Sequence, residues 1–214
     1  MKKYIILNGE KIYPSKIICV GRNYLKHVEE LNNEIPEDIV LFIKPNSSIT
    51  DKIILDRFNN IHYEGELSLL IGKELNHSDI PNIDNSSIKG IGFGLDLTLR
   101  ELQTRLKSKG LPWEKAKGFD GAAFFSKFYP LKDDIRLDNM DFSLKINGEI
   151  RQKSNSSYMI FKPFTIIKKI LEYFSLNEND IIMTGTPAGV GVLNKGDLLE
   201  YEIKNILSGT LKID

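Results

Sequence analysis

The chain has 214 residues, with 29 basic and 29 acidic side chains, so its formal net charge at pH 7 is zero. The length favours one domain over residues 1–214, and the balanced charge argues against partners such as nucleic acid or an acidic membrane. The single cysteine, Cys19, excludes an intrachain disulfide and a cysteine-based zinc site. The apolar run near the N-terminus is too short for a signal peptide or a membrane span, so we expect a cytoplasmic protein.

Short strand-like runs bounded by turn residues dominate the sequence. Asn8-Gly9 and Asn147-Gly148 each predict a β-hairpin, because both residues of the pair adopt positive φ readily. The first pair joins Tyr4–Leu7 to Lys11–Tyr13. The second joins Leu144–Ile146, the end of a strand expected at Phe142–Ile146, to Glu149–Arg151. Further strands are expected at Ile17–Val20, Val40–Ile43, Ile53–Leu55, Glu66–Ile71, Gly90–Leu97, Ile181–Thr184 and Leu198–Ile203.

Helical spacing of apolar residues is found in fewer segments. We expect helices at Asn23–Leu31, at Leu97–Lys109 and, most clearly, at Phe164–Phe174. The strands do not alternate regularly with helices, which argues against a doubly wound parallel sheet. The sequence therefore predicts a strand-rich α+β domain.

Two carboxylates lie one residue apart at the start of an apolar strand. Alternate side chains of a strand share a face, so Glu64 and Glu66 project together. Asp96, at the end of the glycine-rich run Gly92–Leu95, adds a third carboxylate. The three would suit Mg²⁺ or Mn²⁺, since hard cations prefer oxygen ligands. Alternatively, the glutamates mark a solvated strand end and Asp96 caps a helix.

Basic side chains are available for an anionic substrate near these carboxylates. Arg100 and Gln103 follow Asp96 by four and seven residues, so a helix would place all three near one face. Lys117 and Lys44 are further candidates, although a surface lysine and a lysine at a strand end are the ordinary alternatives.

A candidate general base lies near the N-terminus. His27 and Glu30 are three residues apart, so one helical turn would let the carboxylate orient the imidazole toward a water molecule. An ordinary pair on a helix surface is the alternative. Arg22, just before this segment, is a candidate substrate-binding residue.

The glycine-rich turn Met183–Gly191 follows a predicted strand. It can present backbone N–H groups and the Thr186 hydroxyl to an anion. It is not a P-loop, because no Gly-Lys-Ser/Thr ends it.

In this order, these segments resemble the fumarylacetoacetate hydrolase family, over Lys16 to about Ile203. The chain is similar to its short, single-domain branch, which includes acylpyruvases and oxaloacetate decarboxylases. The segments that carry the resemblance are Tyr63-Glu64-Gly65-Glu66-Leu67, Leu95-Asp96-Leu97-Thr98-Leu99-Arg100, Leu111-Pro112-Trp113 with Lys117, Asn147-Gly148-Glu149 with Arg151-Gln152, and Thr184–Gly191.

The resemblance implies a rolled mixed β-sheet with a few helices, a homodimer, and one catalytic domain. It implies Mg²⁺ or Mn²⁺ held by Glu64, Glu66 and Asp96. It also implies a His27–Glu30 pair on a segment that can close as a lid. The positions it places around the substrate's carboxylate and keto oxygens are Lys44, Arg100, Gln103, Lys117 and Thr186.

The implied activity is hydrolysis of a C–C bond in a 2,4-diketo acid (an acylpyruvate). Water activated by His27 and Glu30 would attack the distal carbonyl and leave a pyruvate enolate on the metal, with Lys117 adding positive charge. Oxaloacetate decarboxylation and oxaloacetate keto–enol tautomerisation need the same site and stay open. So do an isomerase or hydratase of 2-keto dienoic acids in aromatic catabolism, and a non-enzymatic metal-stabilised binding module. The presence of both His27 and Glu30 favours hydrolysis.

Overall fold

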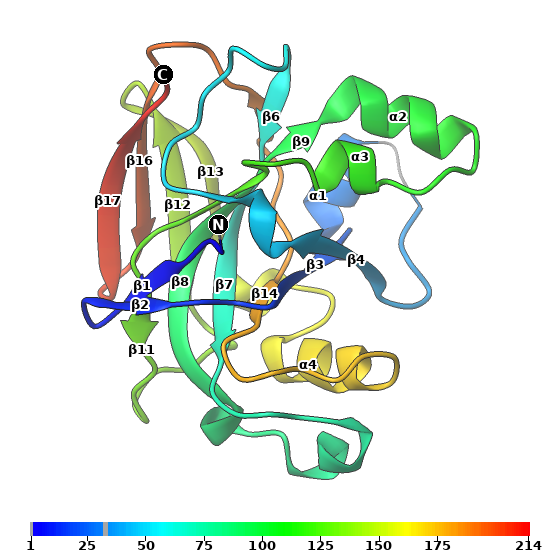
Figure 1. The fold of residues 1–214 in the computed structure, drawn as a ribbon, viewed down its shortest axis with the longest axis vertical. Helices are drawn as coiled ribbons and strands as arrows, with labels where there is room; N and C mark the ends of the chain where they lie inside the picture. The colour runs from blue at the N-terminus through cyan, green and yellow to red at the C-terminus, as the bar shows by residue number, and fades with distance from the viewer. Residues whose placement is uncertain (1, 32–33) are drawn as a thin grey trace.

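The computed structural model describes residues 2–31 and 34–214, and its centre is a curled mixed sheet (Figure 1). Strands β14 and β3 pair in parallel, as do β10 and β5, and the other neighbours are antiparallel. The strand order is β4 (Val40–Pro45), β3 (Lys16–Gly21), β14 (Ile181–Met183), β7 (Gly65–Ile71), β8 (Ile88–Asp96), β10 (Ala123–Phe125) and β5 (Ile49–Thr50), with β11 (Tyr129–Pro130) also pairing with β8.

Smaller sheets complete the fold. An antiparallel sheet runs in the order β13 (Glu149–Asn155), β12 (Asp141–Ile146), β16 (Leu198–Ile203) and β17 (Leu207–Lys212). A short sheet has the order β15 (Gly191–Val192), β6 (Ile61–Tyr63) and β9 (Thr98–Leu99). The N-terminal hairpin consists of β1 (Ile5–Leu7) and β2 (Glu10–Ile12). The expected strand-rich α+β fold with a rolled mixed sheet is confirmed.

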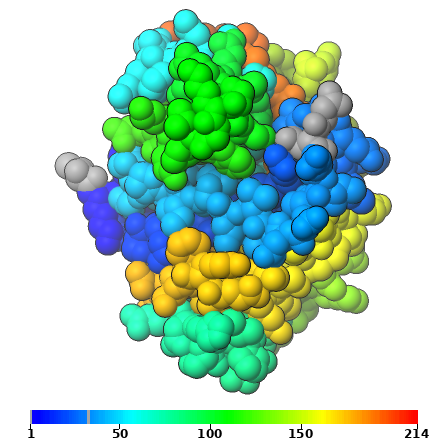
Figure 2. Space-filling view, turned by 90° about the vertical axis from the view of Figure 1, so that its right-hand side faces the viewer, coloured from blue at the N-terminus to red at the C-terminus, as the bar shows by residue number. Residues whose placement is uncertain are grey.

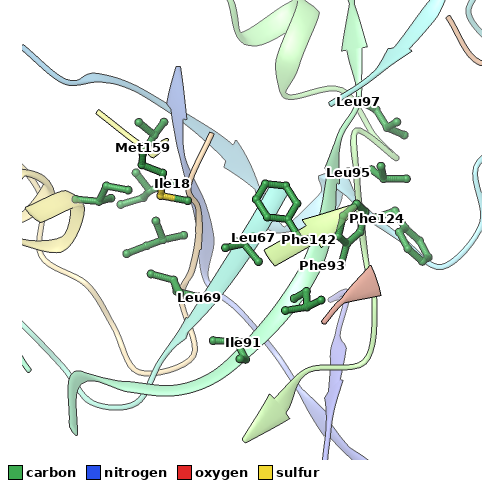
Figure 3. Close-up of a cluster of buried hydrophobic side chains, with 14 of the residues drawn as sticks. Ile18, Leu67, Leu69, Ile91, Phe93, Leu95, Leu97, Phe124, Phe142 and Met159 are labelled. Carbon is green, nitrogen blue, oxygen red and sulfur yellow. The ribbon is translucent and has the colours of Figure 1, made fainter. Parts of the chain in front are cut away.

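Strand β8 has two different faces. Ile91, Phe93 and Leu95 project into the main core (Figure 3). There the ring of Phe93 stacks on that of Tyr201, with the ring centroids 5.2 Å apart. The opposite face carries alternating glycines. A Cβ on Gly94 would lie 2.5 Å from the Ser68 hydroxyl, so only glycine fits there. This close packing holds β7 and β8 in one register.

The helices cover the sheet at separate places. Helices α1 (Leu25–Glu30), α2 (Arg100–Ser108) and α3 (Glu114–Lys117) gather at one end of β7 and β8, and α4 (Pro163–Leu171) packs near the other end (Figure 1). No helix within the described residues is both long enough and apolar enough to cross a membrane. Short 3₁₀ helices are η1 (Asn46–Ser48), η2 (His77–Asn82), η3 (Asn85–Ser87) and η4 (Ser156–Tyr158).

Most predicted elements are present, with shifted ends. Both Asn-Gly pairs form hairpin turns with positive φ at each residue. The strand predicted at Ile53–Leu55 is wrong: Ile53 and Leu55 exchange backbone hydrogen bonds with Asp214 outside any strand, and the neighbouring strand is β5. The helix predicted from Leu97 begins at Arg100, because Thr98 and Leu99 pair with β6 as β9.

Candidate metal centre and active site

The register between β7 and β8 brings three carboxylates together. Gly65 pairs with Leu95 and Glu66 pairs with Gly94, and the backbone N–H of Asp96 donates to the carbonyl of Glu64 at 2.9 Å. Residues opposite each other in a sheet share a face, so Asp96 projects beside Glu64 and Glu66. One oxygen from each of the three lies within 4.8 Å of the others, and the three residues are only 1–5% exposed. The predicted cluster therefore forms, and Asp96 is not a helix cap, since Leu99 precedes α2.

Two buried lysines contact these carboxylates. The ammonium group of Lys117, on α3, donates to Oε2 of Glu64 at 2.9 Å, to Oδ2 of Asp96 at 2.7 Å and to the Thr98 hydroxyl at 2.7 Å. Nζ of Lys44, on β4, lies 2.7 Å from Oδ1 of Asp96 and donates to the carbonyls of Leu97 and Lys117. Lys44 is 0% exposed, and its ammonium group contacts Asp96 and these two backbone carbonyls.

The first turn of α2 adds a third cation. Arg100 forms an ion pair with Oε1 of Glu64 through one terminal nitrogen, and its other terminal nitrogen donates to Oε1 of Gln103 at 2.7 Å. Residues three apart on a helix are neighbours, so Gln103 holds the guanidinium over the carboxylates. The three bases Lys44, Lys117 and Arg100 thus formally cancel the three carboxylates.

The glycine-rich turn after β14 closes another side of the site. The backbone N–H of Gly185 donates to Oε2 of Glu66 at 2.7 Å, and the Thr186 hydroxyl donates to the Gly65 carbonyl at 3.0 Å. Gln152 on β13 links the two segments, because its amide donates to Thr186 at 2.8 Å and its Oε1 accepts from the N–H of Gly65 at 2.8 Å. The sequence analysis did not assign Gln152 to the site, although Gln152 belongs to one of the segments that carry the family resemblance.

The carboxylates differ in their electrostatic surroundings. Burial, together with the negative charges of Asp96 and Glu64, raises the pKa of Glu66 well above the usual value. Burial alone would also raise the pKa of Glu64, but the positive charges of Lys117 and Arg100 outweigh it and lower this pKa. Burial opposes the charge of Lys117, yet Asp96 and Glu64 raise its pKa above the usual value.

This donor set fits a divalent cation. The three ligands are buried oxygens, the donors that Mg²⁺ and Mn²⁺ prefer. Among the ion pairs of the described residues, none includes Glu66, whose oxygen Oε2 is bound instead by a backbone N–H. A buried carboxylate is costly without a positive partner. A metal ion beside Glu66 would supply that charge.

The segment after β3 forms one wall of the pocket, which Arg22 and His27 line. Nδ1 of His27 lies 3.2 Å from Oε2 of Glu30, as the sequence spacing predicts. The other oxygen of Glu30 accepts from the backbone N–H of Gly189 at 3.0 Å, so this carboxylate ties α1 to the glycine-rich turn. Arg22 has a φ of 57°, uncommon for a residue with a side chain, and no described residue offers a hydrogen-bond partner to its buried Nε.

One pocket gathers most of the predicted site residues. It encloses about 450 Å³ of free space, counting its open mouth. Glu30, Lys44 and Glu66 contact the residues of this pocket without lining it. Lys107 could have been found from its helical spacing to Arg100 and Gln103. The lining side chains that the sequence analysis did not assign are Val20, Leu31, Phe42, Lys107 and Trp113. The predicted residues that line the pocket are Arg22, His27, Glu64, Asp96, Arg100, Gln103, Lys117 and Thr186.

Comparison with known proteins agrees with this geometry. Residues 16–213 match the family model described as fumarylacetoacetate (FAA) hydrolase C-terminal. The chain is 42% identical over 193 residues to oxaloacetate tautomerase YcgM of Escherichia coli, covering 87% of this chain and 88% of the relative. It is 38% identical over 197 residues to the mitochondrial oxaloacetate decarboxylase of Dictyostelium discoideum, covering 89% of each.

Solved structures show the same fold. A crystal structure from Oleispira antarctica has a TM-score of 0.92 and 40% identity, covering 98% of this chain and 99% of that chain. Fumarylpyruvate hydrolase from Pseudomonas aeruginosa, solved in complex with Mn²⁺ and pyruvate, has a TM-score of 0.91 and 27% identity, covering 99% and 95%.

Proposed function

This chain belongs to the fumarylacetoacetate hydrolase family, and from that premise we propose that it is a metal-dependent enzyme that interconverts the keto and enol forms of oxaloacetate. The observation that carries the proposal is the cluster of Glu64, Glu66 and Asp96 at the base of a small pocket lined by cations. The identity with the E. coli oxaloacetate tautomerase supports this reaction over acylpyruvate hydrolysis, which the sequence analysis favoured.

The charges of the site suit this substrate. The three carboxylates and the three bases that touch them cancel, so a bound divalent cation would leave about two positive charges. Oxaloacetate carries two negative charges at neutral pH. When bound, the metal would act as a Lewis acid toward the 2-oxo acid. We propose Mg²⁺ or Mn²⁺, and the Mn²⁺ in the P. aeruginosa relative supports a divalent ion.

Tautomerisation moves one proton from C3 to the oxygen on C2. In this proposal Arg100, Gln103 and Thr186 bind and orient the carboxylate and the keto oxygen. The Lys117 ammonium adds positive charge where the oxygen becomes negative. His27, buried in the pocket wall and oriented by Glu30, takes the proton from C3 and passes it to the oxygen on C2, and the reverse transfer forms the keto acid from the enol.

Decarboxylation of oxaloacetate is the second candidate. Loss of the carboxylate attached to C3 leaves the enolate of pyruvate, and the same positive charges would stabilise it. The 38% identity to the Dictyostelium decarboxylase supports this alternative. It differs from tautomerisation in its product, because pyruvate and CO₂ are released.

One experiment separates these reactions. The purified protein is given the enol form of oxaloacetate with Mg²⁺ or Mn²⁺, and the decay of enol absorbance is followed while lactate dehydrogenase and NADH report pyruvate. We expect ketonisation faster than the uncatalysed rate without matching pyruvate. Matching pyruvate would establish decarboxylation, and cleavage of an acylpyruvate without any effect on oxaloacetate would refute both. The homodimer implied by the resemblance stays a prediction, which light scattering tests.

A further inference from the structure

A basic side chain outside the metal cluster lines the same pocket. Lys107 lies seven residues after Arg100 on α2, and Gln103 lies between them, so one helix face carries all three. Seven residues of helix span roughly 10 Å. Arg100 touches Glu64, and Lys107 lies about two turns further along α2, so the helix leads from the carboxylates along the pocket wall to Lys107. Figure 2 shows the green atoms of α2 directly above the blue N-terminal part of the chain.

An aromatic wall connects the inner and outer ends of the pocket. The Lys117 ammonium lies 5.1 Å from the ring centroid of Phe42, and that ring packs against Trp113 at 6.3 Å. The Lys107 ammonium lies 5.3 Å from the ring centroid of Trp113. Each end of the wall therefore has a lysine held over a ring, which restrains a flexible side chain.

The outer end concentrates positive charge. Burial lowers the pKa of Lys107, and the nearby charges of Arg22, Arg100 and Lys117 lower it further. Arg22 lines the pocket with a buried Nε that no described residue satisfies. Lys107 and Arg22 thus place two basic groups in the same part of the pocket, apart from the three bases that contact the carboxylates. Two basic groups in this place favour a ligand with a second negative group at that end.

We propose that Lys107, with Arg22, binds the distal carboxylate of a dicarboxylic 2-oxo acid and so selects this substrate class over monocarboxylic 2-oxo acids. The inference rests on the proposed function, because it takes the 2-oxo acid end to lie at the metal cluster. Lys107 is then a specificity-determining residue, since the inner residues hold the part that all 2-oxo acids share. The aromatic wall separates the two anionic ends.

The test compares two ligands that differ at one end. Oxaloacetate and 2-oxobutyrate both have four carbons, and 2-oxobutyrate has a methyl group in place of the distal carboxylate. The variants are Lys107→Met, which keeps the length without the charge, and Lys107→Arg, which keeps the charge. Lys109→Met is the matched control, because Lys109 is exposed at the end of the same helix and does not line the pocket.

In Lys107→Met we expect KM for oxaloacetate to rise about tenfold, the effect of losing one charge-assisted hydrogen bond. We expect kcat to change less than threefold and the inhibition constant of 2-oxobutyrate to stay constant. Lys107→Arg should have a KM for oxaloacetate close to that of the parent, and Lys109→Met should behave like the parent. Equal weakening of both ligands, or no change in either, would overturn the assignment.

A binding measurement keeps this inference separate from the proposed reaction. Calorimetry with Mg²⁺ present compares the dissociation constants of oxaloacetate and 2-oxobutyrate, whether or not oxaloacetate is turned over. The parent protein could have neither tautomerase nor decarboxylase activity and still prefer the dicarboxylate. If Lys107→Met then abolishes this preference, the result would refute the proposed function and support the subsite. A parent with no preference would refute the subsite alone.

Discussion

Replacement of Lys117 by methionine tests the electrostatics of the carboxylate cluster. The change keeps the apolar stem and removes an ammonium group that donates three hydrogen bonds at 2.7–2.9 Å, two of them to carboxylates. Removing one member of a buried charged pair costs about 3–5 kcal/mol of folding free energy. Glu64 keeps Arg100 and Asp96 keeps Lys44, so we expect a loss near the lower end, about 3 kcal/mol, without metal.

The same variant should respond more strongly to Mg²⁺. In the parent, the Lys117 ammonium occupies oxygens of Glu64 and Asp96, so a metal ion must compete with it for these carboxylates. Without that charge we expect the apparent metal affinity to rise at least tenfold, or about 1.4 kcal/mol. Added Mg²⁺ should therefore recover part of the lost stability, since a ligand stabilises the folded state to which it binds.

Urea unfolding in EDTA and in excess Mg²⁺ measures both effects. Lys115→Met is the control, because Lys115 lies on the same short helix and is exposed. Its unfolding free energy should match the parent within about 0.5 kcal/mol in both conditions. Loss of less than 1 kcal/mol by Lys117→Met in EDTA, or equal stabilisation of variant and parent by Mg²⁺, would show that Lys117 does not neutralise the cluster.

Three other substitutions test separate parts of the site. Glu66→Gln should raise the stability in EDTA, because an amide avoids burying a charge, and should weaken Mg²⁺ binding at least tenfold by calorimetry. His27→Ala should lower kcat for oxaloacetate ketonisation about 100-fold with a small change in KM, and an unchanged kcat would remove His27 from proton transfer. Gly189→Ala should cost about 3 kcal/mol in thermal unfolding, because φ is 99° and the new Cβ would lie 1.9 Å from the Arg151 carbonyl oxygen.

The metal cluster could be predicted because strand periodicity is local. Glu64 and Glu66 share a face whatever the rest of the chain does. Which strand brings the third ligand is not local, because it depends on the register between β7 and β8. Asp96 was selected from its place at the end of a strand, and the ladder that pairs Gly65 with Leu95 confirms its position beside the glutamates.

Other features needed the three-dimensional structure. Gln152 reaches Thr186 from a strand of a different sheet, and no spacing in the sequence indicates this contact. The contacts of Lys44 with Asp96 and with two backbone carbonyls also follow from the fold and from no local spacing, and its place beside the substrate stays a prediction. Strand β17 was not predicted, because half of its residues are exposed and it contains Ser208, Gly209 and Thr210, so apolar alternation is weak.

The three carboxylates of the cluster lie on paired strands. This placement determines which segments of the protein can vary in length or sequence and which cannot. A one-residue insertion in β7 or β8 would turn its carboxylates to the opposite face, so this part of the chain cannot vary in length. Helices α1 and α2 carry His27, Gln103 and Lys107 on elements outside that ladder. New substrate preferences can therefore arise by exchanging residues of the two helices while the carboxylate cluster is inherited intact, which makes these helices the natural targets for directed evolution.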